Sequence, residues 1–186
     1  MRLTGGLERG RRLKAPRGLR TRPTAAKVRE AIFNILGPPP DGSVLDLFAG
    51  TGSLGIEALS RGATRAVFVE RDRNALSALR LNLRELGIDG RSTVIGADVR
   101  TGLRRLAASV SGDDRFSWVF MDPPYADQTE AILAELMQRD LLARCAVVIV
   151  EHDKRHRPPE SVGGLFLTTR RDYGDTELSF YRSGHS

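Results

Sequence analysis

The chain has 186 residues and a mass of 20.4 kDa, and 40% of its residues are hydrophobic, which suffices for one domain with its own core. No apolar run approaches the roughly 18 residues that cross a bilayer, and the sequence begins with charge and glycine instead of a signal peptide. The single cysteine, Cys145, cannot form an internal disulfide. We therefore expect a cytoplasmic protein without membrane association, and a monomer by default.

Positive charge is concentrated at one end of the chain. The formal net charge is +6, yet residues 1–40 hold ten basic and two acidic side chains, a local charge of +8, so the other 146 residues carry −2. Basic side chains gain affinity for phosphates by releasing condensed counterions. The sequence therefore predicts a basic extension over residues 1–40 that binds a nucleic acid, and a body over residues 41–186; a solvated, arginine-rich tail is the alternative.

The extension contains signals for a hairpin and a helix. Residues 2–4 and 10–14 are typical of two short strands joined through glycine turns. Thr24 is expected to cap a helix whose core-facing positions are Val28, Ile32, Ile35 and Leu36. The segment 37–42, Gly-Pro-Pro-Pro-Asp-Gly, fits neither a helix nor a central strand and separates the extension from the body.

In the body, short apolar runs alternate with amphipathic segments of helical length. Parallel strands are predicted over residues 44–48, 66–69, 93–95, 118–121 and 146–150, with helices over 53–61, 73–86, about 100–110 and 128–138. Two further strands, 165–170 and 177–182, are expected to form a closing antiparallel pair. This alternation predicts right-handed crossovers and a doubly wound, Rossmann-like α/β fold with a seven-stranded, mostly parallel sheet.

A glycine-rich turn follows the first predicted strand. Gly50, Gly52 and Gly55 match G-x-G-x-x-G between a strand and a helix, a pattern shared by nicotinamide, flavin and S-adenosylmethionine sites. Ile-Glu follows the last glycine where a P-loop requires Lys-Ser/Thr. Asp46, four residues before the turn, suits a ligand with an ammonium or sulfonium group and would repel a pyrophosphate. The turn therefore favours S-adenosylmethionine.

Two more acids stand at predicted strand ends. Glu70 can accept the ribose hydroxyls of a nucleoside, although a strand-end surface acid would look the same. Asp98 could receive an adenine amino group or cap the following helix. With their neighbours these residues form the predicted cofactor-binding set: Asp46, Phe48, Ala49, Gly50, Thr51, Gly52, Gly55, Glu70, Arg71, Asp98 and Val99.

The catalytic prediction rests on Asp122-Pro-Pro-Tyr125, directly after the fourth strand. The two prolines fix the backbone and leave the carbonyls of Asp122 and Pro123 as acceptors, while Tyr125 offers a stacking face. Acceptors for both hydrogens of an exocyclic amine favour its rehybridisation and aim its lone pair at a sulfonium methyl. Asp122, Pro123 and Tyr125 are therefore the predicted catalytic residues, with Asp122 taking the proton.

Taken in order, Asp46, Gly50-x-Gly52, Glu70, Asp98 and Asp122-Pro-Pro-Tyr125 resemble the class I S-adenosylmethionine-dependent amino-methyltransferases. Further motifs are similar to the bacterial methyltransferases of guanine N2 in 16S ribosomal RNA: Gly5-Gly6, Arg9-Gly-Arg11, Arg22-Pro-Thr24, Val28-Arg-Glu30, Phe33-Asn34, Asp46-Leu-Phe-Ala-Gly-Thr-Gly52, Tyr173-Gly and Tyr181. The resemblance implies that the basic extension docks on RNA in the small ribosomal subunit. We assign that contact to Arg9, Arg11, Arg12, Lys14, Arg22, Thr24 and Arg29.

Other functions stay open at this point. The Asp-Pro-Pro-Tyr motif also serves adenine N6 or cytosine in DNA and glutamine amides in proteins, and the basic extension argues against the last of these. A nucleotide-binding dehydrogenase and a non-catalytic RNA-binding assembly factor are further alternatives. No metal is expected, because His152, His156 and His185 lack metal-site spacing, and Cys145 is expected to be a small core residue.

Overall fold

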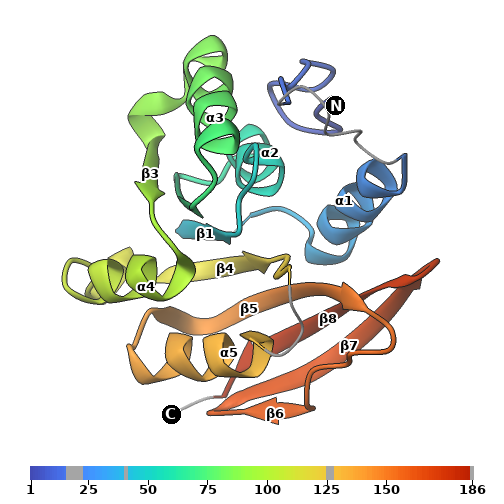
Figure 1. Ribbon diagram of the computed structural model, residues 1–186, viewed down its shortest axis with the longest axis vertical. Helices are drawn as coiled ribbons and strands as arrows, with labels where there is room; N and C mark the ends of the chain where they lie inside the picture. The colour runs from blue at the N-terminus through green and yellow to red at the C-terminus, as the bar shows by residue number, and fades with distance from the viewer. Residues whose placement is uncertain (16–22, 40–41, 125–127, 185–186) are drawn as a thin grey trace.

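The computed structural model describes residues 1–15, 23–39, 42–124 and 128–184. Within them the strands form one sheet in the order β3-β2-β1-β4-β5-β8-β7-β6 (Figure 1). The strands are β1 Ser43–Leu47, β2 Arg65–Glu70, β3 Ser92–Gly96, β4 Phe116–Met121, β5 Leu142–Asp153, β6 Ser161–Val162, β7 Leu165–Tyr173 and β8 Thr176–Ser183. The first five run parallel, and the last three pair antiparallel. The doubly wound sheet is confirmed, and β6 is a two-residue addition to the seven predicted strands.

Helices cover both faces of the sheet. They are α1 Pro23–Leu36, α2 Ser53–Ser60, α3 Arg73–Leu86, α4 Val99–Ala107 and α5 Thr129–Gln138. Apolar side chains of α1, α2 and α3 pack on one face, around Trp118 and Phe120. Those of α4 and α5 pack on the other, around Leu45 and Val119. Strands β1, β2 and β4 are therefore buried from both sides, as their near-continuous apolar runs require, whereas the edge strand β3 is only partly buried.

Helix α1 is part of this core. It begins at Pro23, whose fixed φ and missing N–H suit the first helical position, so Thr24 lies in the first turn and does not precede it as a cap. The Phe33 ring contacts Trp118 and Phe120, with centroids 6.1 and 5.8 Å apart. Of the four positions predicted to face the core, Val28 and Ile32 are buried and Leu36 is partly buried, whereas Ile35 is 41% exposed, so that part of the prediction is wrong.

The first fifteen residues form the predicted hairpin, with little regular strand. Leu3 N–H donates to the Arg11 carbonyl at 3.0 Å and Leu13 N–H to the Met1 carbonyl at 2.8 Å, yet only one bridge, Arg2 with Arg12, is formed. Leu3 and Leu13 are 2% exposed and belong to the core cluster of α1 and α2. The hairpin is therefore packed onto the body.

Helix α2 holds the hairpin and α1 through Glu57, which is fully buried. The Glu57 carboxylate accepts hydrogen bonds from Thr4 N–H at 2.9 Å, Arg29 Nε at 3.2 Å and Arg61 Nε at 3.0 Å. Ser60, at the end of the helix, accepts two further hydrogen bonds from the hairpin. Its carbonyl accepts Leu7 N–H at 2.8 Å, and its Oγ accepts Glu8 N–H at 2.9 Å. The hairpin, α1 and α2 thus form one hydrogen-bonded unit (Figure 1).

The expectation that Cys145 is a core residue is wrong. Strand β5 begins at Leu142, earlier than predicted, and its pairing with β4 shifts register between the partners Phe116–Leu142 and Trp118–Val147. Cys145 lies in that irregularity with φ 59° and is exposed, because extra residues in one strand redirect side chains outward. In the described part of the chain no helix is long and apolar enough to cross a membrane.

Candidate functional site

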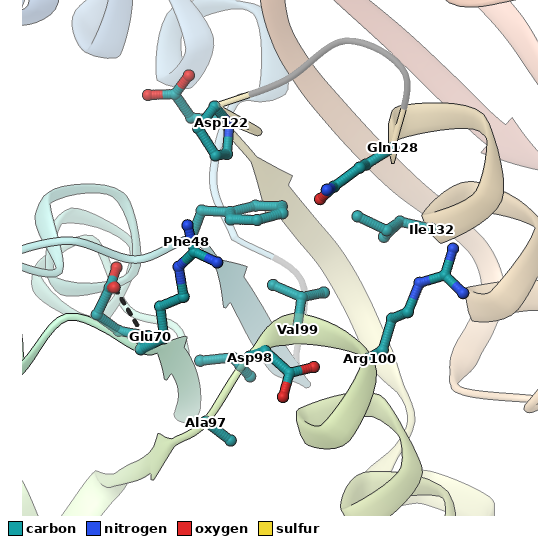
Figure 2. A pocket seen from close by; sticks show the side chains of 12 residues that line it. Phe48, Glu70, Ala97, Asp98, Val99, Arg100, Asp122, Gln128 and Ile132 are labelled. Carbon is teal, nitrogen blue, oxygen red and sulfur yellow. Dashed lines mark hydrogen bonds between the residues drawn. The ribbon is translucent and has the colours of Figure 1, made fainter.

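Two cavities lie at the carboxyl edge of the parallel strands, where side chains that follow different strands come together. The larger, of 540 Å³, is lined by residues after β1, β2, β3 and β4, including Phe48, Glu70, Asp98 and Asp122 (Figure 2). The smaller, of 260 Å³, is lined by Asp46, Phe48, Asp122 and Glu151 among others. Phe48 and Asp122 line both cavities, so the two adjoin at the ends of β1 and β4.

The turn after β1 is tightly constrained. Phe48 has φ 59°, a left-handed conformation that costs a non-glycine residue about 1–3 kcal/mol and is typical of functional sites. Gly50 also has positive φ, lines the smaller cavity, and a Cβ there would meet nothing within 4 Å. A Cβ at Gly52 would lie 2.3 Å from Leu79 Cδ1, and one at Gly55 2.4 Å from the Phe68 ring. Gly50 therefore faces open space, whereas the other two glycines permit close packing.

Two predicted acids line the larger cavity and are held by backbone donors. Glu70 Oε2 accepts Gly50 N–H at 2.7 Å, and its Oε1 accepts the N–H groups of Arg71 and Asp72 at 2.7 Å each. Asp98 caps α4 by accepting Thr101 N–H at 3.0 Å, and this bond holds its pKa below the usual range. Asp98 thus serves as helix cap and as cavity lining at once, and Glu70 is fixed in orientation.

Three carboxylates around the smaller cavity have raised pKa values. Asp46 is 3% exposed, and among the described residues its side chain accepts one hydrogen bond, from Gly55 N–H at 2.9 Å. Burial, with the nearby charges of Asp122 and Glu70, raises its pKa to about 8. Asp122 lines both cavities, and the surrounding protein removes part of its hydration and raises its pKa. Burial and the charge of Asp122 raise the pKa of Glu151 to about 7. No ion pair of these three carboxylates with a basic side chain is found among the described residues.

A cationic ligand would relieve this electrostatic cost. Arg29 is the one cation among the described residues that line the smaller cavity, and its guanidinium is already paired with Glu57. A sulfonium or ammonium group placed here would favour the charged forms of Asp46, Asp122 and Glu151. A pyrophosphate would be repelled by the same three groups. The site therefore fits S-adenosylmethionine and disfavours a dinucleotide.

Most of the predicted cofactor residues lie around these two cavities. The larger is lined by Phe48, Glu70, Arg71, Asp98 and Val99, and the smaller by Asp46, Phe48, Ala49, Gly50 and Thr51; Gly52 and Gly55 line neither. Of the predicted catalytic residues, Asp122 lies between the cavities and Pro123 is half-buried beside it, while Tyr125 falls outside the described residues. Figure 2 shows the Asp122 carboxylate pointing away from the Phe48 ring.

Glu151 was missed by the sequence analysis. It follows the buried run 146–150 in the same way that Asp122 follows 118–121, but it belongs to no recognisable motif. The sheet order places β5 beside β4, so the two acids adjoin. The available signal was its position at the end of an apolar strand, the same signal that identified Asp46 and Glu70.

The predicted RNA contacts divide into four groups, of which Arg29 is the last. Arg9 and Arg12 are exposed, and no hydrogen bond or ion pair of either side chain is found among the described residues. Arg11 donates to the Glu85 carbonyl at 2.9 Å, and Lys14 pairs with the Glu85 carboxylate, both at the surface. Arg22 and the side chain of Thr24 fall outside the described residues.

Arg29 does not belong to an RNA-binding surface. It is 2% exposed, bonds to the Arg2 carbonyl as well as to Glu57, and burial lowers its pKa. A buried guanidinium committed to a buried carboxylate cannot release counterions from a phosphate backbone. We therefore withdraw Arg29 from the predicted RNA contacts. Among the described residues, no group of three or more His, Cys, Asp or Glu side chains is placed to hold a metal ion.

The fold, with its antiparallel last strands and its acids at the ends of β1, β2 and β4, is that of a class I methyltransferase. The family model described as "Conserved hypothetical protein 95" matches residues 1–182. The chain therefore belongs to that family.

Similar proteins agree with this class. A Bacillus subtilis protein, YlbH, named as a candidate rRNA methyltransferase, is 41% identical over 98% of both chains. Ribosomal RNA small subunit methyltransferase D of Escherichia coli K12 is 35% identical, over 98% of this chain and 89% of its own. The solved structure of the Escherichia coli candidate methyltransferase yhhF is 34% identical and superposes with a TM-score of 0.85, covering 100% of this chain and 99% of that one.

Proposed function

We propose that this protein transfers a methyl group from S-adenosylmethionine to the exocyclic N2 amine of a guanine in 16S ribosomal RNA, within the assembled small subunit. The observation that carries this proposal is the position of Asp122, which joins a nucleoside-sized cavity to a smaller acidic one. The names of the similar proteins support an RNA substrate, and the basic hairpin supports binding of a polyanion.

The chain's own residues account for cofactor binding. In the larger cavity Glu70 accepts the ribose hydroxyls, and Asp98 receives the adenine amino group. In the smaller cavity Gly50 admits the amino-acid portion, and Asp46 lies close enough to the cationic end to offset its own burial. The cofactor supplies an electrophilic methyl group on a sulfonium.

Asp122 and Pro123 prepare the amine for transfer. Their carbonyls and the Asp122 carboxylate accept the two N–H hydrogens, which favours a tetrahedral nitrogen with its lone pair directed at the methyl carbon. S-adenosylmethionine would give up its methyl group to the nitrogen and leave as a neutral thioether, and Asp122 would take the extra proton from the nitrogen. The raised pKa of Asp122 suits a group that must hold this proton.

The hairpin places positive charge beside the substrate entrance. Ala15, at its end, lines the smaller cavity together with Asp122 and Glu151. The neighbouring cations Arg9, Arg11, Arg12 and Lys14 carry the extension's contact with phosphates. Residues 1–40 therefore dock the RNA and also form part of the wall of the smaller cavity. Methylation of DNA or of protein is an alternative that the following experiment distinguishes.

The test is transfer of labelled methyl from S-adenosylmethionine to four acceptors in parallel: small subunits lacking the modification, protein-free 16S RNA, duplex DNA and bulk protein. The modified nucleoside is identified by mass spectrometry. We expect label in N2-methylguanosine, greatest on the subunits. Label in DNA bases, or no label despite measurable cofactor binding, would overturn the proposal.

A further inference from the structure

Sheet register brings Glu151 next to Asp122. Met121 of β4 pairs with Val150 of β5, so Asp122, which follows the end of β4, lies beside Glu151, the next residue of β5. Both line the 260 Å³ cavity together with Asp46. Their side chains therefore share the space into which the reacting amine must enter.

Neither of these two carboxylates contributes a side-chain hydrogen bond or ion pair to the described part of the fold. In the described part of the chain no hydrogen bond or ion pair reaches the side chain of Asp122 or Glu151. The residue opposite Glu151 on β8 is Leu178, which has no polar side chain to offer, and the residues after Glu151 are engaged elsewhere, with His152 Nε2 2.8 Å from Ser179 Oγ. Glu151 is thus an acceptor aimed at a cavity and left without a donor.

A second acceptor beside Asp122 discriminates between bases. On its Watson–Crick edge guanine carries two adjacent donors, N1–H and the N2 amine. Adenine and cytosine place an acceptor, N1 or N3, beside their exocyclic amine. A carboxylate accepts hydrogen bonds only, so it pairs with the guanine N1–H and repels the lone pair on the other bases.

We propose that Glu151 determines base specificity: its carboxylate accepts the N1–H of the target guanine while Asp122 and Pro123 hold the N2 amine. This inference rests on the proposed function and deepens it, because Asp-Pro-Pro-Tyr alone does not choose between amines. The cost of leaving Glu151 unpaired opposite a wrong base is what rejects that base.

The arrangement also makes the reaction depend on pH. The charged groups that face Glu151 in the cavity are Asp122, Asp46 and Arg29, and Arg29 is neutralised by Glu57. Burial and Asp122 raise the pKa of Glu151 to about 7. The ionised carboxylate accepts N1–H more strongly than the neutral acid does, and a bound sulfonium lowers the pKa of Glu151, so transfer increases with pH up to about that value. In Glu151→Gln this part of the profile disappears.

The test compares Glu151→Gln with the wild-type protein and with Glu160→Gln, which alters an exposed glutamate outside both cavities. We expect unchanged affinity for S-adenosylmethionine by calorimetry and transfer to small subunits reduced about 10- to 100-fold. The control variant retains full transfer.

A base analogue separates specificity from a structural effect. After the target nucleotide has been mapped, subunits are reconstituted with 2-aminopurine at that position, which keeps the 2-amine but has an acceptor at N1. The wild-type protein should strongly prefer guanine. The Glu151→Gln amide can donate to N1, so the preference should shrink about tenfold or more.

Two results would overturn the inference. An equal preference in wild type and Glu151→Gln would show that Glu151 does not contact the base edge. A loss of cofactor affinity in the variant would assign Glu151 to the ammonium of S-adenosylmethionine. Failure of the wild-type protein to form N2-methylguanosine is a separate result, visible without any variant, and removes the proposed function together with the inference.

Discussion

Two buried carboxylates meet helix α2 in very different ways. Glu57 lies within the helix, is fully buried, and accepts hydrogen bonds from Thr4, Arg29 and Arg61. Asp46 is nearly as buried, yet within the described part of the chain it accepts a hydrogen bond from Gly55 N–H alone, and its pKa is raised to about 8. The first is part of the fold's own hydrogen bonding, and the second reduces stability until a cation arrives. Buried charge therefore indicates function only where its partners are missing.

The largest effect is expected where an unpartnered carboxylate meets the substrate. Asp122→Ala should slow methyl transfer about 100- to 10,000-fold. The variant lacks the carboxylate that accepts a hydrogen bond from the amine and takes the proton from the nitrogen. The fold should be retained, since no hydrogen bond of the Asp122 side chain is found among the described residues. Initial rates and thermal melting measure both effects. Asp89→Ala, at an exposed site outside both cavities, is the control, and unchanged turnover in Asp122→Ala would refute the assigned role.

Removing the fully paired carboxylate should damage stability. Glu57→Ala leaves the Arg29 guanidinium buried without its partner, and we expect a loss of about 3–5 kcal/mol in the free energy of unfolding. Urea titration gives this value. Glu130→Ala, an exposed change on α5, should stay within about 0.5 kcal/mol. A loss in Glu57→Ala no larger than that of the control would mean that the hairpin does not depend on this carboxylate.

Asp46→Asn should increase the free energy of unfolding, whereas Glu57→Ala should decrease it. The pKa of Asp46 in the folded protein is about 8, against about 3.9 in the unfolded chain, so folding binds a proton and wild-type stability falls between those values as pH rises. The variant lacks this penalty. It should be more stable by about 2 kcal/mol or more near pH 8 and equal to wild type near pH 4. A difference that does not change with pH would contradict the assignment of the penalty to this group.

The smallest effect concerns the surface of the hairpin. Replacing Arg9, Arg11, Arg12 and Lys14 with glutamine should weaken RNA binding and flatten its salt dependence by roughly one unit of slope for each phosphate that is no longer neutralised. Stability should barely change, because the exposed pairs with Glu85 contribute little. Binding isotherms at several salt concentrations provide the slope, with Arg105→Gln plus Arg171→Gln as the control. An unaltered slope would remove the hairpin from the RNA interface.

The sequence predicted the architecture and most of the site because both follow local rules. Alternating apolar runs and amphipathic segments define parallel strands and crossovers, and parallel strands deliver Asp46, Glu70, Asp98 and Asp122 to one edge. Glu151 needed one further fact, that β5 adjoins β4, which no local pattern contains.

The errors have a common cause in contacts between distant parts of the chain. Arg29 belongs to a basic stretch of sequence and was therefore assigned to a solvated surface, but Glu57, 28 residues later, draws it into the interior. Cys145 precedes an apolar run and was assigned to the core, but the register shift against β4 turns it outward. Charge and hydropathy indicate whether a residue tends to be exposed or buried, but contacts with distant parts of the chain decide where it lies in the fold.

Helix α2 is only eight residues long, yet its first turn continues the glycine turn at Gly52 while Glu57 and Ser60 anchor the hairpin. At 1.5 Å per residue it spans about 12 Å, and each residue advances its side chains by about 100° around the axis. Inserting a single residue between Gly55 and Glu57 would swing the anchor out of line with the turn. The length of this one helix therefore sets the rotational phase between the hairpin and the glycine turn, so an insertion at this point would separate the two.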